Sequence, residues 1–294
     1  MFGHAPTDPS AVARELRAAA QCPFIHDKCT KQFRDGRTSG VCTVQMARGD
    51  SPVVCCPNRL YADDYRILMD VARIAFGDGV RLVNGDEVAK ASHDGRNVAV
   101  FGKRWGKELR LPHRDAGRGG YFVDWVLALI SARGALDEFV AVEVQSIDTT
   151  GTYRGEWDAY MRDEEPVGLS NAGLNWENVS KRILPQLIHK GNVLRRERLC
   201  TKGLFFVCPT QVYEAVQGRL AHDLAEYPGP AAGTLTFVWY GLGPQVGAGS
   251  VRNLIMDGRL TTTIEQIALA LTSAHNLPPA GVYEQAIRAE LAGH

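Results

Sequence analysis

The sequence lacks several features that would assign it quickly to a functional class. No apolar run approaches the ~20 residues that a membrane-spanning helix needs. The first residues lack the basic-then-apolar pattern of a signal peptide, so we expect a cytoplasmic protein. Lys and Arg number 33, as do Asp and Glu, so the formal net charge is +0. This balance argues against a protein that coats nucleic acid generally, but it allows site-specific binding through local basic faces.

The cysteines also lack a familiar spacing, because the sequence contains no Cys-x-x-Cys pair. Five of the seven nevertheless fall within residues 22–59, a segment with few large apolar residues. Thiolates that bind iron or zinc can fold such a segment when it has no core of its own. The candidate ligands are Cys22, Cys29, Cys42 and one of Cys55 and Cys56.

Cys56 is the preferred fourth ligand, because Pro57 follows it and would turn the chain away from the site. The alternative for the whole group is free buried cysteines or redox chemistry. Cys200 and Cys208 lie far away in the sequence and are typical of core residues.

Length and composition favour a soluble α/β protein. The chain has 294 residues, 45% of them hydrophobic and 22% charged, which is enough for a large core. Hydrophobic periodicity predicts helices near residues 11–21, 63–76, 175–190, 210–226, 262–273 and 282–291. Strands are expected near residues 98–101, 108–111, 121–129, 138–147, 204–208 and 234–240. We therefore expect a mixed central sheet flanked by helices, with residues 1–78 forming an N-terminal helix and four-cysteine segment and residues 79–294 forming the core.

The most informative stretch is Val140–Ser146, an apolar strand with a carboxylate and an amide in its middle. Side chains alternate faces along a strand, so the valines at 140, 142 and 144 share one face. Glu143 and Gln145 share the other face with Ala141. A carboxylate flanked by valines is costly to desolvate unless a cation meets it.

A second carboxylate, Asp124, lies upstream in another apolar strand. Two carboxylates can hold Mg²⁺, which prefers oxygen ligands and can activate water for phosphodiester hydrolysis. Gln145 would then orient the water or the phosphate, although it cannot act as a strong base. The alternative interpretation is a buried Asp–Arg or Glu–Lys ion pair inside the sheet.

Basic residues crowd the sequence before the Asp124 strand and around the 175–190 helix, as a DNA channel would require. A solvated charged face is the alternative for any one of them. The candidate DNA contacts are Arg104, Lys107, Arg110, Arg114, Arg118, Lys181 and Arg182. Lys190, Arg195, Arg196 and Arg198 extend the second group.

Taken together, six blocks resemble the NotI-like family of type II restriction endonucleases, within the PD-(D/E)xK nuclease superfamily. The resemblance covers roughly residues 20–240 and depends on the order of the blocks. They are Cys22-Pro-Phe with Cys29, Gly40-Val-Cys42, Cys55-Cys56-Pro57-Asn58-Arg59, Gly120-Tyr-Phe-Val-Asp124-Trp125, Val142-Glu143-Val-Gln145-Ser146-Ile-Asp-Thr-Thr-Gly-Thr-Tyr153 and Asn175-Trp176-Glu177-Asn-Val-Ser-Lys181-Arg182-Ile-Leu-Pro185-Gln186.

The resemblance implies that Asp124, Glu143 and Gln145 carry catalysis, with Gln145 replacing the lysine of the superfamily motif. It also implies one structural iron, which maps onto Cys22, Cys29, Cys42 and Cys56. Family members act as homodimers on GC-rich palindromes and leave 5′ overhangs. We therefore expect an Mg²⁺-dependent, site-specific deoxyribonuclease that leaves 5′ phosphate and 3′ hydroxyl ends, encoded with a cognate DNA methyltransferase that it does not contact.

Two other functions remain open at this point. The chain could be a sequence-specific DNA-binding metalloprotein without catalysis, in which the acidic pair is structural. It could instead be a repair or mobile-element nuclease of the same superfamily, which would cut according to DNA structure.

Overall fold

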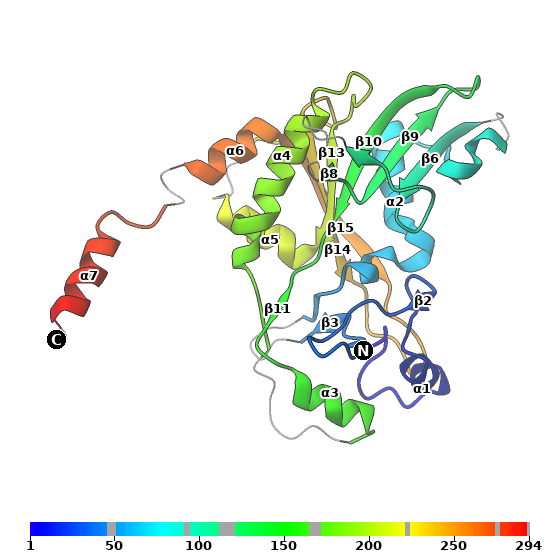
Figure 1. The fold of residues 1–294 in the computed structure, drawn as a ribbon. Coiled ribbons are helices and arrows are strands. Elements are labelled where there is room, and N and C mark those ends of the chain that lie inside the picture. Colours follow the sequence, from blue (N-terminus) through cyan, green and yellow to red (C-terminus); the bar gives the residue numbers. More distant parts are fainter. Residues whose placement is uncertain are drawn as a thin grey trace.

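The protein is described here from a computed structural model that covers residues 1–45, 51–90, 95–111, 121–164, 172–220, 224–273 and 277–292. Within these residues seven strands form one sheet in the order β15-β14-β13-β10-β9-β6-β5. Helices lie on both sides of this sheet, and the N-terminal segment lies at one end (Figure 1). The expected α/β class with a mixed sheet is confirmed.

Three parallel and three antiparallel pairings hold the sheet together. The parallel pairs are β5–β6, β10–β13 and β13–β14, and the antiparallel pairs are β6–β9, β9–β10 and β14–β15. The central strand, β10, therefore has an antiparallel neighbour on one side and a parallel neighbour on the other. The strands are β5 Val80–Asn84, β6 Arg96–Gly102, β9 Trp125–Ile130, β10 Leu136–Val144, β13 Leu204–Pro209, β14 Thr234–Leu242 and β15 Leu254–Thr263.

Helices and short two-stranded pairs complete the described structure. The helices are α1 Ala11–Ala18, α2 Ala62–Phe76, α3 Arg154–Met161, α4 Leu184–Leu194, α5 Thr210–Arg219, α6 Ile264–Thr272 and α7 Val282–Ala292, with a π-helical turn at Val179–Ile183 and 3-10 turns at Pro57–Tyr61 and Gly85–Lys90. The short strands are β1 Gln21–Cys22, β2 Asp27–Lys28, β3 Thr43–Val44, β4 Val53–Val54, β7 Arg110–Leu111, β8 Tyr121–Phe122, β11 Thr149–Thr150 and β12 Gly173–Leu174.

Each face of the sheet carries its own apolar core. On one face α2 packs on Val140, Val142 and Val144 of β10, so the predicted core face of this strand is confirmed. On the other face α4, α5 and α6 pack on Ala141 and on the inner side chains of β13 and β14. Glu143 follows the alternation to this second face, beneath α4.

The N-terminal segment is joined to the first core rather than set apart from it. Cys22, Phe24 and Cys42 belong to the same buried cluster as α2 and the sheet strands. The boundary at residue 78 stays a prediction. In the described part of the chain no helix is long and apolar enough to cross a membrane.

Several predicted helix boundaries are wrong, and for α2 and α6 local geometry gives the reason. Asp63 does not cap α2, because residues 63–65 have positive φ values of 56°, 51° and 60°, so the regular helix begins only after them. The cap of α6 is Thr263 rather than Thr262, since its hydroxyl accepts the Gln266 N–H at 3.2 Å. Helix α5 ends at Arg219, before the predicted Glu226.

The segment between β10 and β13 departs most from the prediction. Residues 151–172, for which no helix or strand was predicted, contain α3, whose Trp157 and Tyr160 are buried. The helix predicted from Asn175 begins at Glu177, passes through a π-helical turn at Val179–Ile183 and continues in α4 past Gly191 to Leu194. Pro185 lies directly after the π-helical turn and inside continuous helical structure, so the bond that a backbone N–H would donate at this position is missing. Strand β15 was not predicted at all.

Candidate active site

Asp124 and Glu143 lie beside each other on neighbouring strands. The register of β9 and β10 pairs Trp125 with Val142, which places the preceding Asp124 next to Glu143. The Val144 N–H donates to Oδ2 of Asp124 at 2.8 Å. The Asp124 N–H also favours the charged form of the Glu143 carboxylate. The two acids predicted from the sequence are therefore brought together, and the backbone of β10 holds the Asp124 side chain in place.

Burial and mutual repulsion make the charged form of this pair costly. Glu143 is 8% exposed, whereas Asp124 keeps an exposed surface at the edge of the site. Desolvation, followed by repulsion from Asp124, raises the pKa of Glu143 to about 7. Desolvation also raises the pKa of Asp124, and the nearby Glu108 adds to this effect. A site in which two carboxylates resist ionisation favours a cation between them.

One cation already reaches the pair. Nζ of Lys190, on α4, lies 2.6 Å from Oε1 of Glu143, and the two side chains are 15% and 11% exposed. This contact is a buried Glu–Lys ion pair of the kind that the alternative interpretation of the sequence predicts. The sequence placed Lys190 on a DNA-facing patch and did not connect it with Glu143. One feature of the sequence could have indicated that Lys190 faces the sheet. Lys190 lies three residues after the apolar Leu187, which places both side chains on one face of the helix.

The third predicted catalytic residue, Gln145, directly follows β10. It is half-buried, and its N–H donates to the Val207 carbonyl at 3.0 Å. This bond extends the pairing of β10 with β13 by one residue and fixes the backbone beside Glu143. By alternation its side chain belongs to the face that carries Glu143.

Three of the candidate DNA-contacting residues form ion pairs with acidic side chains. Arg104 pairs with Asp27 at 3.4 Å, Lys181 with Glu177 at 2.5 Å and Arg182 with Asp148 at 3.4 Å. Lys107 is exposed. Arg114, Arg118 and the side chain of Arg110 lie outside the described residues.

The cysteines of the N-terminal segment are buried except Cys29, which is half-buried. Burial raises the pKa of Cys42 to about 11 and that of Cys56 to about 12. Backbone N–H groups hydrogen-bond three of the candidate sulfur atoms: those of Phe24 and Ile25 at Cys22, of Gly3 at Cys42 and of Asn58 at Cys56. Nζ of Lys31 lies 3.3 Å from Sγ of Cys55. Cys200 and Cys208 are buried in the second core, as predicted.

Across the described ranges, no group of three or more His, Cys, Asp or Glu side chains is arranged to hold a metal ion. The four-cysteine centre therefore stays a prediction. The acidic pair provides two carboxylates, and its chemistry suits Mg²⁺, which takes few protein ligands and keeps several waters.

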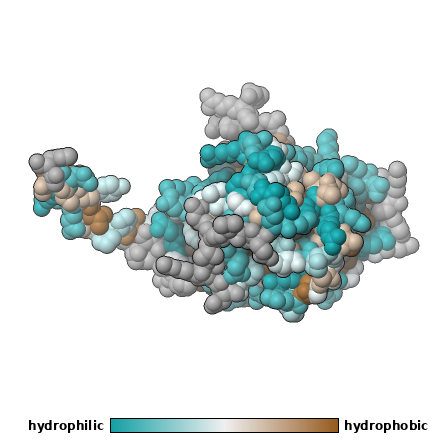
Figure 2. Space-filling view, turned by 90° about the horizontal axis from the view of Figure 1, so that it is seen from below, coloured by the Kyte–Doolittle hydropathy of each residue, from teal (hydrophilic) through white to brown (hydrophobic). Residues whose placement is uncertain are grey.

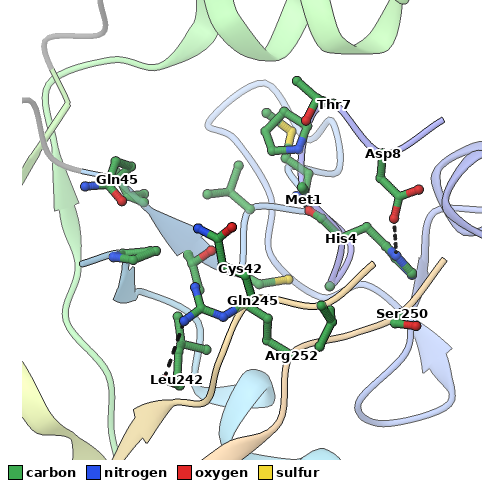
Figure 3. A pocket seen from close by; sticks show the side chains of 18 of the residues that line it. Met1, His4, Thr7, Asp8, Cys42, Gln45, Leu242, Gln245, Ser250 and Arg252 are labelled. Carbon is green, nitrogen blue, oxygen red and sulfur yellow. Dashed lines mark hydrogen bonds and ion pairs between the residues drawn. The ribbon is translucent and has the colours of Figure 1, made fainter. Parts of the chain in front are cut away.

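One pocket of the described residues lies elsewhere, between the N-terminal segment and the chain that connects β14 to β15. Its volume is about 750 Å³, and its lining includes Met1, Cys42, Gln245 and Arg252 (Figure 3). Neither Asp124 nor Glu143 lines it. An elongated duplex binds along an open surface rather than in a closed cavity, so the distance between this pocket and the acids is no argument against the site.

A mixed sheet that presents two adjacent acids and a lysine defines a site suited to metal-dependent hydrolysis of a phosphate ester. The family model for the restriction endonuclease NotI matches residues 9–223. The chain therefore belongs to the NotI restriction endonuclease family. This membership supports the assignment of the protein as a type II restriction endonuclease, which acts on DNA. No curated protein gives a significant match.

Proposed function

We propose that this protein is an Mg²⁺-dependent type II restriction endonuclease of the PD-(D/E)xK type. It hydrolyses double-stranded DNA at a GC-rich palindrome and leaves 5′ phosphate and 3′ hydroxyl ends. The observation that carries this proposal is the position of Asp124 and Glu143 side by side at the ends of adjacent strands, where the Val144 N–H donates a hydrogen bond to Asp124.

Asp124 and Glu143 would hold Mg²⁺, which when bound lowers the pKa of water and compensates charge on the phosphate. The sheet fixes both acids, so little reorganisation is needed on binding. Asp124 supplies the solvent-facing side of the site, where DNA can approach. Gln145 supplies a neutral amide that orients the water or a phosphate oxygen.

For the N-terminal segment we propose one structural iron, with zinc as the alternative, held by Cys22, Cys29, Cys42 and Cys56. The N–H groups that reach Cys22 and Cys56 come from equivalent Cys-Pro-x turns, with Pro23 and Pro57 in the middle. Such N–H bonds stabilise thiolate ligands. Cys55 is instead engaged by Lys31, which favours Cys56 as the ligand. Elemental analysis that finds neither metal would remove this part of the proposal.

Binding to a palindrome requires two protomers related by a two-fold axis, so we propose a homodimer. The expected setting is the cytoplasm, together with a cognate DNA methyltransferase that does not contact this chain. Arg104, Lys107, Arg110, Arg114, Arg118, Lys181 and Arg182 are the proposed DNA contacts. Because such contacts release counterions, DNA affinity should fall steeply as salt rises.

The direct test is a digest of unmethylated genomic DNA with and without Mg²⁺, followed by sequencing of the ends. Discrete bands that require Mg²⁺ support the proposal. Binding without cleavage would identify a DNA-binding metalloprotein, and a smear would identify a structure-directed nuclease.

The Glu143→Ala protein tests the residue assignment. It should bind DNA in Ca²⁺ and fail to cut it in Mg²⁺, because one of two metal ligands is gone. Retained cleavage would show that the acids are structural.

A further inference from the structure

The contact between Lys190 and Glu143 is unusual among the ion pairs of this protein. Both side chains are less than one-fifth exposed, at 15% and 11%. In every other Lys or Arg ion pair within the described residues, at least one side chain is 36% exposed or more. Lys190 is therefore largely shielded from solvent, and its ammonium group contacts the carboxylate of Glu143.

Stability alone is a weak reason for such a pair. Desolvating two charges costs several kcal/mol per ion in real proteins, and attraction between them repays this only in good geometry. An apolar pair of similar size is often as stable or more so. Buried ionisable groups with a charge partner at an open site are instead typical of functional sites.

The packing of α4 fixes Lys190 against the sheet. Leu187 and Leu194, three residues before it and four after, are both buried in the second core. Gly191, which directly follows Lys190, packs closely on Ile264. A Cβ added to Gly191 would lie 2.2 Å from the Cδ1 atom of Ile264. Lys190 thus extends its stem along an apolar helix face and delivers only its ammonium group to Glu143.

Lys190 also supplies the positive charge that Gln145 lacks. The polar face of β10 carries Glu143 and the neutral amide of Gln145, so β10 itself contributes no positive charge there. Lys190 counteracts the raised pKa of both Glu143 and Asp124, which places its charge within reach of the whole pair. An ammonium group has three donors, so contact with Oε1 of Glu143 leaves two for another acceptor.

We propose that Lys190 is a catalytic residue of the hydrolysis proposed above, on which this inference rests, and that its ammonium group donates a hydrogen bond to a non-bridging oxygen of the scissile phosphate. In the step, a water oxygen bonds to phosphorus and the bond from phosphorus to the 3′ oxygen breaks. The water gives one proton to solvent, and the leaving 3′ oxygen takes one up. Lys190 keeps its proton and compensates the charge that develops on the phosphate.

The test compares Lys190→Met, which keeps the stem and removes the charge, with Lys190→Arg. Lys202→Met, at a half-exposed position in the turn before β13, is the matched control. The measurements are single-turnover cleavage in Mg²⁺, DNA affinity in Ca²⁺, Mn²⁺ binding by electron paramagnetic resonance and thermal unfolding. Lys190→Met should lose about 100-fold or more in cleavage rate, with DNA affinity and Mn²⁺ binding retained. Lys190→Arg should recover part of the rate, and the control should match the parent protein.

Cleavage by Lys190→Met at the parental rate would overturn the inference, because the lysine would then be only a counter-ion of Glu143. A parallel loss of Mn²⁺ binding and cleavage would also overturn it, since Lys190 would then merely position Glu143. If Lys190→Met unfolds, the double variant Glu143→Gln, Lys190→Met restores charge balance. This double variant is expected to keep the fold and to lose Mn²⁺ binding. In that case the cleavage rate of the Lys190→Arg protein alone decides the inference. Failure of the parent protein to cut any DNA would refute the proposed function instead.

Discussion

Asp8 shows how a single carboxylate fastens the N-terminal segment to the rest of the molecule. Its oxygens accept the Ser10 N–H at 2.9 Å and the Gly249 N–H at 2.9 Å, and they contact Nδ1 of His4 at 3.0 Å. The side chain is 4% exposed. Burial alone would raise the pKa of Asp8, but these hydrogen bonds outweigh it and hold the pKa well below its usual range.

Replacing Asp8 by Asn should therefore destabilise the protein at pH 7 by about 1–3 kcal/mol, since a hydrogen-bonded charge is lost. A carboxylate whose pKa is lower in the native state stabilises that state at pH values above its unfolded pKa of about 3.9. This stabilisation is lost as the pH falls through the native pKa. The gap in Tm between the two proteins should thus narrow as pH falls below about 4. Asp137→Asn, at an exposed position of β10, is the control. A gap that is constant with pH would show that the carboxylate charge is not what matters.

Helix α4 shows which parts of the structure the sequence could predict. Apolar alternation predicted the faces of β10, and with them the shared face of Glu143 and Gln145. The spacing could not reveal the partner of Glu143, because that partner comes from a helix 47 residues away. The π-helical turn at Val179–Ile183 inserts an extra residue per turn and so changes the face that α4 presents. The predicted helix stops at residue 190, before Gly191, because glycine often ends a helix, yet tertiary packing needs Gly191 inside α4.

The glycine in α4 can be tested directly. Gly191→Ala should destabilise the protein by about 1–3 kcal/mol, because the new methyl group overlaps the fully buried Ile264. Gly218, within α5, has open space where its Cβ would lie. Gly218→Ala should leave stability unchanged or raise it by up to about 1 kcal/mol, as alanine is the better helix former. Urea unfolding of both variants provides the comparison, and equal effects would contradict the packing of α4 on α6.

The sheet extends beyond the region that the family model matches, which ends at residue 223. Strands β14 and β15 continue the sheet past this point, and their neighbour Ile267 on α6 is fully buried. Helix α7 differs, because none of its residues is buried and Tyr283 and Leu291 are 80% and 73% exposed. It lies apart from the sheet in Figure 1, and apolar colour marks the same arm in Figure 2. The folding unit thus ends after α6, at neither the match boundary nor the last residue.

Two truncations test where the folding unit ends. A protein of residues 1–273 should keep the Tm of the full chain, because removing α7 exposes no core. A protein of residues 1–223 should fail to fold, since β13 loses β14 and the second core loses Leu235, Phe237 and Ile264. Circular dichroism and thermal unfolding measure both outcomes, and light scattering reports the mass of each species. A marked fall in Tm for 1–273 would mean that the apolar side chains of α7 pack against the protein in solution, on the same chain or on a second copy.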